Sequence, residues 1–218
     1  MLTMRGSYFS GVVALLVAIA CLPSLPSLAA TNPKQADIAS HLHVLSSGVK
    51  VSMADYSVPE IWLTRDDGKK VLLDKELDDG RIVVMNFIFT TCPGICPMMS
   101  QVFSQFQTRL GADRDRVHMV SISIDPEQDT PARLRAYAKQ FSAGSQWTHY
   151  TGALKASIAA QKAFDAYQGD KMNHDALTLM RPAPGKPWVR LDGFATSADL
   201  LAQYIGVAAM CEPGNEKR

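Results

Sequence analysis

Two nearly continuous apolar runs of strand length constrain the fold of this chain more than any other feature. They cover residues 81–89 (RIVVMNFIF) and 117–124 (VHMVSISI) and are rich in β-branched and aromatic side chains. Such runs are typical of strands that are buried on both faces of a parallel sheet. Between them, apolar residues recur at every fourth position from Met98 to Leu110. This spacing predicts a helix over about residues 97–110 that ends at Gly111.

The rest of the chain continues this alternation of strands and helices. An N-terminal β-hairpin is predicted around the turn Asp66-Asp67-Gly68, and a helix is expected to open at Thr130-Pro131. Further strands are expected over residues 147–150, 176–181 and 188–191, and further helices over 154–164 and 197–205, the last capped by Ser197. This order predicts an α/β protein with a thioredoxin-like fold, in which a central, mostly parallel sheet is flanked by helices.

The first 30 residues have the pattern of a secretory signal. Arg5 precedes a short apolar stretch over residues 11–22, and small residues then lead to Ala30. The apolar stretch is short for a membrane span, which takes about 20 residues. An uncleaved membrane anchor and a lipoprotein signal that ends at Cys21 are the alternatives. We therefore expect an exported protein, either periplasmic or anchored in the membrane and facing the periplasm.

The expected organisation of the chain follows from these segments. We expect a signal peptide or membrane anchor over residues 1–30, a polar tether over 31–47, a thioredoxin-like domain over 48–209 and a tail over 210–218. His41 and His43 lie in the tether and are expected to be solvated rather than metal ligands. With 22 Lys and Arg against 21 Asp and Glu, the formal net charge is +1. The composition therefore gives no basic footprint for nucleic acid.

The motif Cys92-Pro-Gly-Ile-Cys96-Pro97 lies between the first buried run and the following helix. In an α/β sheet, ligands bind at this carboxyl end of a strand. Pro97 suits the first helical position, so Cys96 is expected at or near the N-cap, where the helix dipole favours a thiolate. Two thiolates suit Cu(I), with Zn²⁺ as the rival, or a reversible disulfide. A purely structural disulfide is the other alternative, although it would close a tiny loop and remove little chain entropy.

An imidazole could complete a trigonal copper site and would also stabilise Cu(II). His118 lies inside a predicted strand and His149 lies near the end of another, so both are expected to be packed or surface residues. His174 differs because it directly precedes the strand predicted over residues 176–181, on a loop that lies across from the cysteines in a thioredoxin-like sheet. Its position alone leaves open whether it is a ligand or a structural residue.

The segments FTTCPGICP and SISIDPEQDTP, followed by a His just ahead of a strand, resemble the Sco (SenC) family. The similarity runs from about Tyr56 to Val207, and the pairing of CxxxCP with DPxxDTP is quite specific, whereas CxxxC alone recurs by chance. In that family two cysteines and one histidine bind one copper ion as Cu(I) or Cu(II). The resemblance implies that Cys92, Cys96 and His174 are the copper ligands and that residues 48–209 form a copper-binding domain.

The resemblance also implies a function and partners. The family delivers copper to the binuclear copper site of cytochrome c oxidase or prepares the thiols of that site. The expected partners are therefore the copper subunit of the oxidase or another exported copper protein, together with a thiol reductant. Asn173 and Asp175 replace the Asp and Ser that usually flank the family's His, and residues 181–187 are unusually rich in proline. These departures leave the identity of the copper recipient open.

The same cysteines are compatible with an enzyme. An exported thiol–disulfide oxidoreductase would use Cys92 and Cys96 as a redox-active pair that keeps partner cysteines reduced. Thioredoxin-type enzymes usually carry CxxC and a proline opposite it. This chain has CxxxC and no proline between Lys171 and Arg181. These differences favour metal binding, so we expect a copper chaperone rather than an enzyme.

Acidic and sulfur-containing residues near the motif have competing interpretations. Asp125 either orients a ligand or partner or stabilises the turn after its strand, with Asp129 or Thr130 capping the next helix. Met98 matches the apolar face of its helix and is expected in the core. The role of Met172 stays open, because thioether sulfur binds Cu(I). Cys211 is expected to be a free cysteine.

Overall fold

The computed structural model describes residues 45, 46 and 48–211. The predicted signal peptide or anchor over 1–30 lies outside the described residues. So do His41 and His43, the tether apart from residues 45 and 46, and residues 212–218 of the tail. Within the described part, no helix has the length and apolarity needed to cross a membrane.

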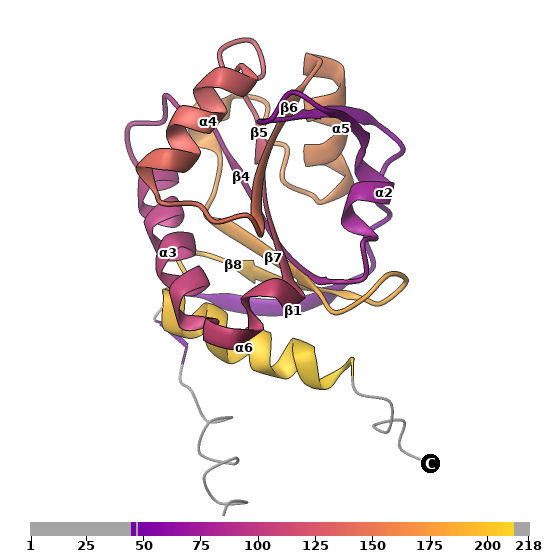
Figure 1. The fold of residues 1–218 in the computed structure, drawn as a ribbon, viewed down its shortest axis with the longest axis vertical. Coiled ribbons are helices and arrows are strands. Elements are labelled where there is room, and N and C mark those ends of the chain that lie inside the picture. The colour runs from indigo at the N-terminus through magenta and orange to yellow at the C-terminus, as the bar shows by residue number, and fades with distance from the viewer. Residues whose placement is uncertain (1–44, 47, 212–218) are drawn as a thin grey trace, which may run out of the picture.

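From residue 82 onward the described chain alternates strands and helices in the predicted order, whereas the helix over residues 73–77 was not predicted (Figure 1). The strands are β1 (Lys50–Ala54), β2 (Trp62–Arg65), β3 (Lys70–Leu72), β4 (Ile82–Ile88), β5 (Val117–Ser123), β6 (Trp147–Gly152), β7 (Leu177–Arg181) and β8 (Trp188–Asp192). The α-helices are α2 (Leu73–Leu77), α3 (Ile95–Arg109), α4 (Pro131–Gln140), α5 (Leu154–Ala163) and α6 (Ser197–Ala209). Short 3₁₀ helices are η1 (Gly111–Arg116) and η2 (Lys171–Asn173).

All eight strands belong to one sheet, in the order β1-β8-β7-β4-β5-β6-β2-β3. The sheet was predicted to be mostly parallel, but only its central pairs, β4–β5 and β5–β6, are parallel. The flanking pairs are antiparallel, so the sheet is mixed. The predicted N-terminal hairpin is confirmed as β2 and β3, which lie at one edge of the sheet. No strand was assigned to β1, whose alternating apolar residues Val51 and Met53 are both exposed, and it forms the opposite edge.

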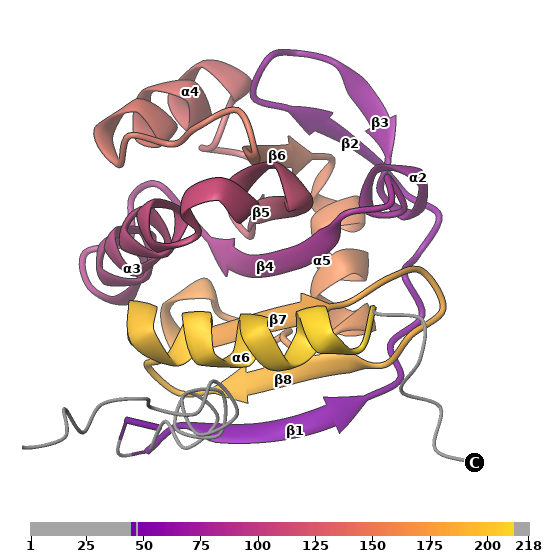
Figure 2. The same cartoon turned by 60° about the horizontal axis from the view of Figure 1, so that its bottom comes forward.

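Helices cover both faces of the sheet. As a result, every residue of β4 and β5 is buried. In Figure 1, α3 and α4 lie on one side of the central strands, and α2 and α5 lie on the other. α6 packs against α3, and Figure 2 shows it running across β7 and β8. The core between these layers is aromatic, with the rings of Phe103 and Trp147 5.6 Å apart. Burying such a ring stabilises the folded state by up to about 3 kcal/mol. The packed layers therefore hold the carboxyl ends of the central strands in place.

The helix termini show where sequence patterns locate boundaries well. The Oγ1 of Thr130 accepts a hydrogen bond from the backbone N–H of Arg133, and Pro131 begins α4, as predicted. The cap of α6 was expected to be Ser197, but it is Thr196. Thr196 forms a capping box with Asp199, the third helical residue, which satisfies two backbone N–H groups instead of one. Gly111 follows α3 with a φ of 53°, the left-handed conformation that suits glycine after a helix.

Candidate metal centre

Cys92 and Cys96 lie where β4 leaves the sheet and α3 begins. The N-cap of α3 is Gly94, so Cys96 is already in the first helical turn and Pro97 is the third helical residue. The prediction that Pro97 opens the helix was therefore wrong. A proline is tolerated anywhere in the first turn, because the N–H groups there have no partner within the helix.

Cys96 is completely buried, and Cys92 is 9% exposed. The backbone N–H of Phe89 approaches the Cys96 sulfur at 3.5 Å, and the N–H of Cys96 donates to the Cys92 sulfur at 3.4 Å. Both cysteines are free thiols. Burial raises the pKa of Cys96 well above its usual value and outweighs the hydrogen bond from Phe89. The expectation that the helix N-terminus would favour a Cys96 thiolate is thus not met, because burial has the larger effect on its pKa.

His174 directly follows η2 and reaches the cysteines from the far side of the loop. Its Nε2 lies 3.0 Å from the Cys96 sulfur, and its Nδ1 lies 3.1 Å from the backbone oxygen of Asp175. Burial lowers the pKa of His174. The backbone oxygen of Asp175 can only accept, so Nδ1 donates to it, and Nε2 is directed at the Cys96 sulfur. This is the tautomer that a metal ligand requires.

The structure thus brings together two sulfurs and one imidazole nitrogen from two distant segments. The ligand atoms of Cys92, Cys96 and His174 all lie within 4.8 Å of one another. A cavity of about 320 Å³ lies beside them, lined in part by Cys92, Gly94 and His174. Two soft donors and one borderline donor at this separation suit Cu(I) or Zn²⁺, and a single ion between them would need only small side-chain rotations.

An ion pair holds the loop that carries His174. The Nζ of Lys171, in η2, lies 2.6 Å from Oδ2 of Asp125, which lies two residues after the end of β5 and is 6% exposed. The ammonium also lies 5.6 Å from the centre of the Phe89 ring, and that ring packs edge-on against His174 at 5.7 Å. Asp125 therefore fixes the position of the loop rather than acting as a ligand within the three-residue cluster.

Asp129 holds the cysteine-bearing loop from the other side. Its buried carboxylate accepts hydrogen bonds from the backbone N–H and hydroxyl of Thr90 and from the hydroxyl of Ser123, the last at 2.6 Å. Asp129 was predicted as an alternative helix cap, but Thr130 fills that role. The carboxylate instead links Ser123, at the end of β5, to Thr90, which follows β4 and lies two residues before Cys92.

The other histidines and the third described cysteine are not part of the three-residue cluster. His118 and His149 are buried in the sheet, as expected, and burial lowers the pKa of each to about 4. Cys211 is a free thiol, also as expected, and its Sγ donates to the backbone oxygen of Pro182 at 3.1 Å. Met98 was expected in the core but is 52% exposed, and its neighbour Met99 takes the buried position.

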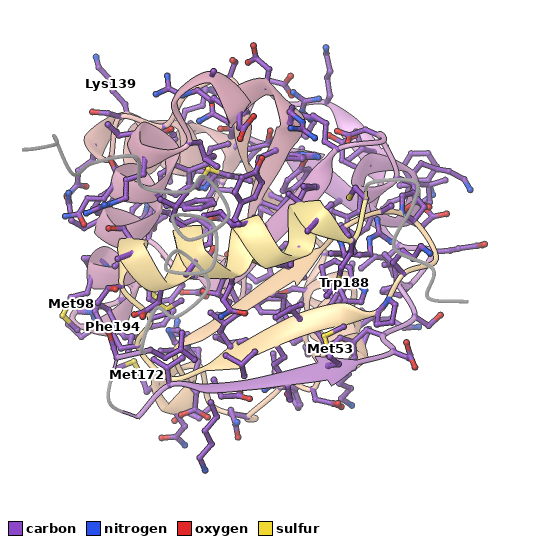
Figure 3. The ribbon with its side chains drawn as sticks, turned by 90° about the horizontal axis from the view of Figure 1, so that it is seen from below. Met53, Met98, Lys139, Met172, Trp188 and Phe194 are labelled. Atoms are coloured by element: carbon purple, nitrogen blue, oxygen red, sulfur yellow. The ribbon has the colours of Figure 1, made fainter. Side chains whose placement is uncertain are left out.

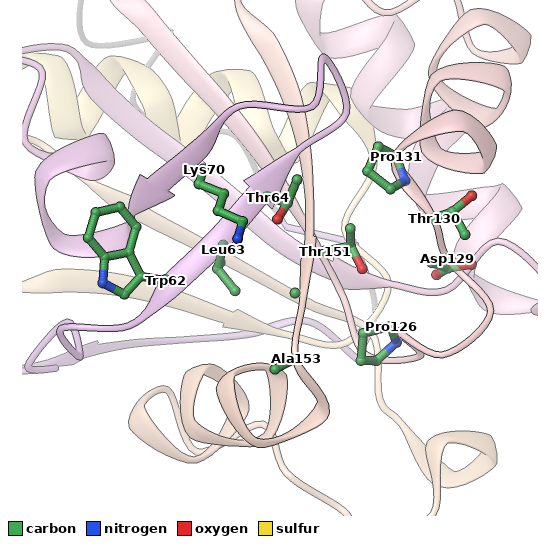
Figure 4. Close-up of a pocket in the computed structure, with 11 residues that line it drawn as sticks. Trp62, Leu63, Thr64, Lys70, Pro126, Asp129, Thr130, Pro131, Thr151 and Ala153 are labelled. Carbon is green, nitrogen blue, oxygen red and sulfur yellow. The ribbon is translucent and has the colours of Figure 1, made fainter.

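A cavity larger than the one at the metal centre lies elsewhere in the described structure. It has a volume of about 730 Å³ and lies between the β2–β3 hairpin and the start of α4 (Figure 4). Its lining includes Trp62 and Thr151 but no cysteine or histidine. Its one carboxylate, that of Asp129, is already bonded to Thr90 and Ser123. The cavity therefore offers no set of metal ligands.

Sequence reasoning identified the three clustered side chains and named Asp125 as a residue that could orient a ligand, but it did not find the contacts that hold the site together. Lys171 is three positions before His174, and nothing in the sequence marks Asp125 as its partner. Asp129 belongs to the DPEQDTP segment, which carries part of the family resemblance but does not reveal the contact with Thr90. Both contacts join loops at the ends of neighbouring strands, so only the topology of the sheet could have revealed them.

Comparison with known proteins is consistent with this geometry. The SCO1/SenC family profile matches residues 56–204. The SCO1 protein homolog of Bacillus subtilis is 33% identical over 115 residues, which are 51% of this chain and 58% of that protein. The chain therefore spans less than two thirds of the length of that curated relative.

Two solved structures share the fold. The first is BsSco, described as a member of the Sco family of cytochrome c oxidase assembly proteins with a disulfide switch. It is 26% identical and has a TM-score of 0.60, with 74% of this chain and 98% of that chain covered. The second is Arabidopsis thaliana ScoI with copper bound, which is 25% identical and has a TM-score of 0.57. The match covers 70% of this chain and 97% of that chain. The thioredoxin-like fold predicted from the sequence is thereby confirmed.

Proposed function

Because the chain belongs to the SCO1/SenC family, we propose that it binds one copper ion as cargo through Cys92, Cys96 and His174. The observation that carries the proposal is the convergence of the three ligand atoms within 4.8 Å. The same metal is bound in the Arabidopsis relative, whose structure contains copper. The two thiolates are suited to Cu(I), and the imidazole allows the site to hold Cu(II) as well.

The recipient we propose is the copper site of cytochrome c oxidase, or another exported copper protein. BsSco, a relative with the same fold, is described as an oxidase assembly protein. A three-coordinate site beside an open cavity allows an incoming thiolate to bind the ion before the first ligand leaves. Release then begins with His174, because it is the most exposed of the three ligands.

Export is part of this proposal. The basic and apolar N-terminal pattern of residues 1–30 supports a signal peptide or a membrane anchor, with a tether over 31–47, the copper-binding domain over 48–209 and a tail over 210–218. A periplasmic site also requires a thiol reductant, because the Cys92–Cys96 pair must be reduced to bind copper. The intact mass of the protein recovered from the periplasm and from membranes distinguishes cleavage from anchoring.

The alternative function is an exported thiol–disulfide oxidoreductase. The adjacent free thiols of Cys92 and Cys96 favour it. The pair would transfer two electrons and two protons to a partner disulfide, become a disulfide itself and then need the exported reductant. The CxxxC spacing opposes this function, because thioredoxin-type enzymes usually carry CxxC.

Copper titration of the reduced full chain under anaerobic conditions tests the proposal. We expect one copper per chain, no stoichiometric binding by Cys92→Ser or Cys96→Ser, and sharply weakened binding by His174→Ala. Cys211→Ser is the matched control, because it removes a free thiol that lies outside the cluster. Unchanged copper binding by His174→Ala, together with strong reduction of insulin disulfides, would support the oxidoreductase instead.

A further inference from the structure

One soft side chain beside the three-residue cluster has no place in the core. Met172, in η2, is 58% exposed and lines the same cavity as Cys92 and His174. An exposed methionine contributes little to folding, because its apolar surface stays in water. Figure 3 shows its side chain at the same edge of the molecule as Met98, which is also exposed.

The backbone beneath Met172 is fixed while its side chain is free. The carboxylate of Asp170 accepts a hydrogen bond from the N–H of Met172 at 2.9 Å. The adjacent Lys171 is held by Asp125, and His174 follows two residues later. A methionine side chain has three rotatable bonds, so it can swing over the cavity without moving this turn.

The cavity contains few other groups that could bind a soft cation. Of its remaining polar side chains, Lys171 carries a positive charge that is paired with Asp125, and Asp175 offers hard carboxylate oxygens. The thioether of Met172 is neutral and soft. Soft thioether sulfur selects Cu(I), whereas Cu(II) prefers nitrogen and oxygen.

We propose that the thioether of Met172 is a further ligand for Cu(I) at the site of Cys92, Cys96 and His174. The inference rests on the proposed function and extends it, because it gives Cu(I) a ligand that Cu(II) does not use. Cu(I) binds with three sulfurs and one nitrogen, and Cu(II) binds without Met172. The thioether also keeps Cu(I) coordinated when His174 is displaced during transfer.

The test compares Met172→Leu with Met98→Leu in the full chain. Leucine keeps the apolar character and approximate volume of methionine but lacks sulfur. Met98 is a matched control, because it is 52% exposed at the same edge and does not line the cavity. The measurements are Cu(I) affinity by competition with a chromophoric chelator, Cu(II) affinity, and the number of sulfur neighbours of Cu(I) by X-ray absorption.

We expect Met172→Leu to reduce Cu(I) affinity about tenfold, to leave Cu(II) affinity within about twofold and to reduce the sulfur count from three to two. Met98→Leu should match the wild type in all three measurements. An unchanged sulfur count and Cu(I) affinity in Met172→Leu would overturn the inference, as would equal losses in the two variants. If the wild type binds no copper, or if Cys92→Ser binds it equally well, the proposed function itself fails.

Discussion

Replacing Asp129 with Asn should destabilise the protein by about 2 kcal/mol and loosen the cysteine loop. The buried carboxylate accepts hydrogen bonds from Thr90 and Ser123. An amide keeps one oxygen for Thr90 but presents an N–H₂ group to the Ser123 hydroxyl. That hydroxyl already accepts from the N–H of Asp125 at 3.0 Å, so its own hydrogen is left without a partner. The loss is one charge-assisted hydrogen bond, and a buried donor is left unsatisfied.

Urea denaturation followed by tryptophan fluorescence measures this loss, and copper titration measures its effect on the site. We expect copper affinity to fall several-fold, because Thr90 directly precedes the loop that carries Cys92. Asp113→Asn is the control: its side chain is 45% exposed and pairs with Arg116 at the surface, so it should change stability by less than about 0.5 kcal/mol. An Asp129→Asn variant as stable as this control would refute the reasoning.

Three further changes probe other parts of the structure. Lys171→Met removes the ion pair with Asp125 and should weaken Cu(II) binding about tenfold, with partial rescue by Lys171→Arg. Competition titrations measure this affinity. Full Cu(II) affinity in Lys171→Met would contradict a role for Lys171 in holding His174. Burial lowers the pKa of His149 from 6.5 to about 4. The contribution of the neutral ring to the free energy of unfolding is therefore complete above about pH 6.5. It is lost at about 1.4 kcal/mol per pH unit as the pH falls toward 4. Urea midpoints measured across this range should show a shallower decline in His149→Phe, and the same decline in both proteins would exclude His149 as the cause. Thr196→Ala removes the capping box of α6 and should lower the free energy of unfolding by about 1 kcal/mol; an unchanged melting temperature would count against the box.

The central elements were predictable because their sequence patterns are set by burial. β4 and β5 are buried at every position, and their apolar runs are correspondingly continuous. α4 begins at Pro131 with Thr130 as its cap, a local signal that needs no tertiary information. β1 could not be predicted in the same way, because its first four residues are exposed and it depends on pairing with β8.

The errors near the site have a common physical cause. Met98 and Pro97 were placed with a helix that begins at Pro97, whereas α3 begins two residues earlier, at Ile95. Pro97 therefore marks the first turn of the helix but not its first residue. The predicted thiolate failed because the helix-terminus argument omitted burial, which determines the pKa of Cys96 in this protein. Exposure and desolvation depend on the whole packed structure, so local spacing does not report them.

The two halves of the metal centre are held in different ways, and this difference bears on copper transfer. Cys96 is fully buried in the first turn of α3, between the end of β4 and the core. His174 lies on a loop outside the sheet, held by the Lys171–Asp125 ion pair and the edge-on contact with Phe89. A partly exposed loop outside the sheet opens at lower cost than a helix packed in the core. We therefore expect the imidazole to leave the ion first, with the buried sulfur releasing it only when a partner thiolate has bound.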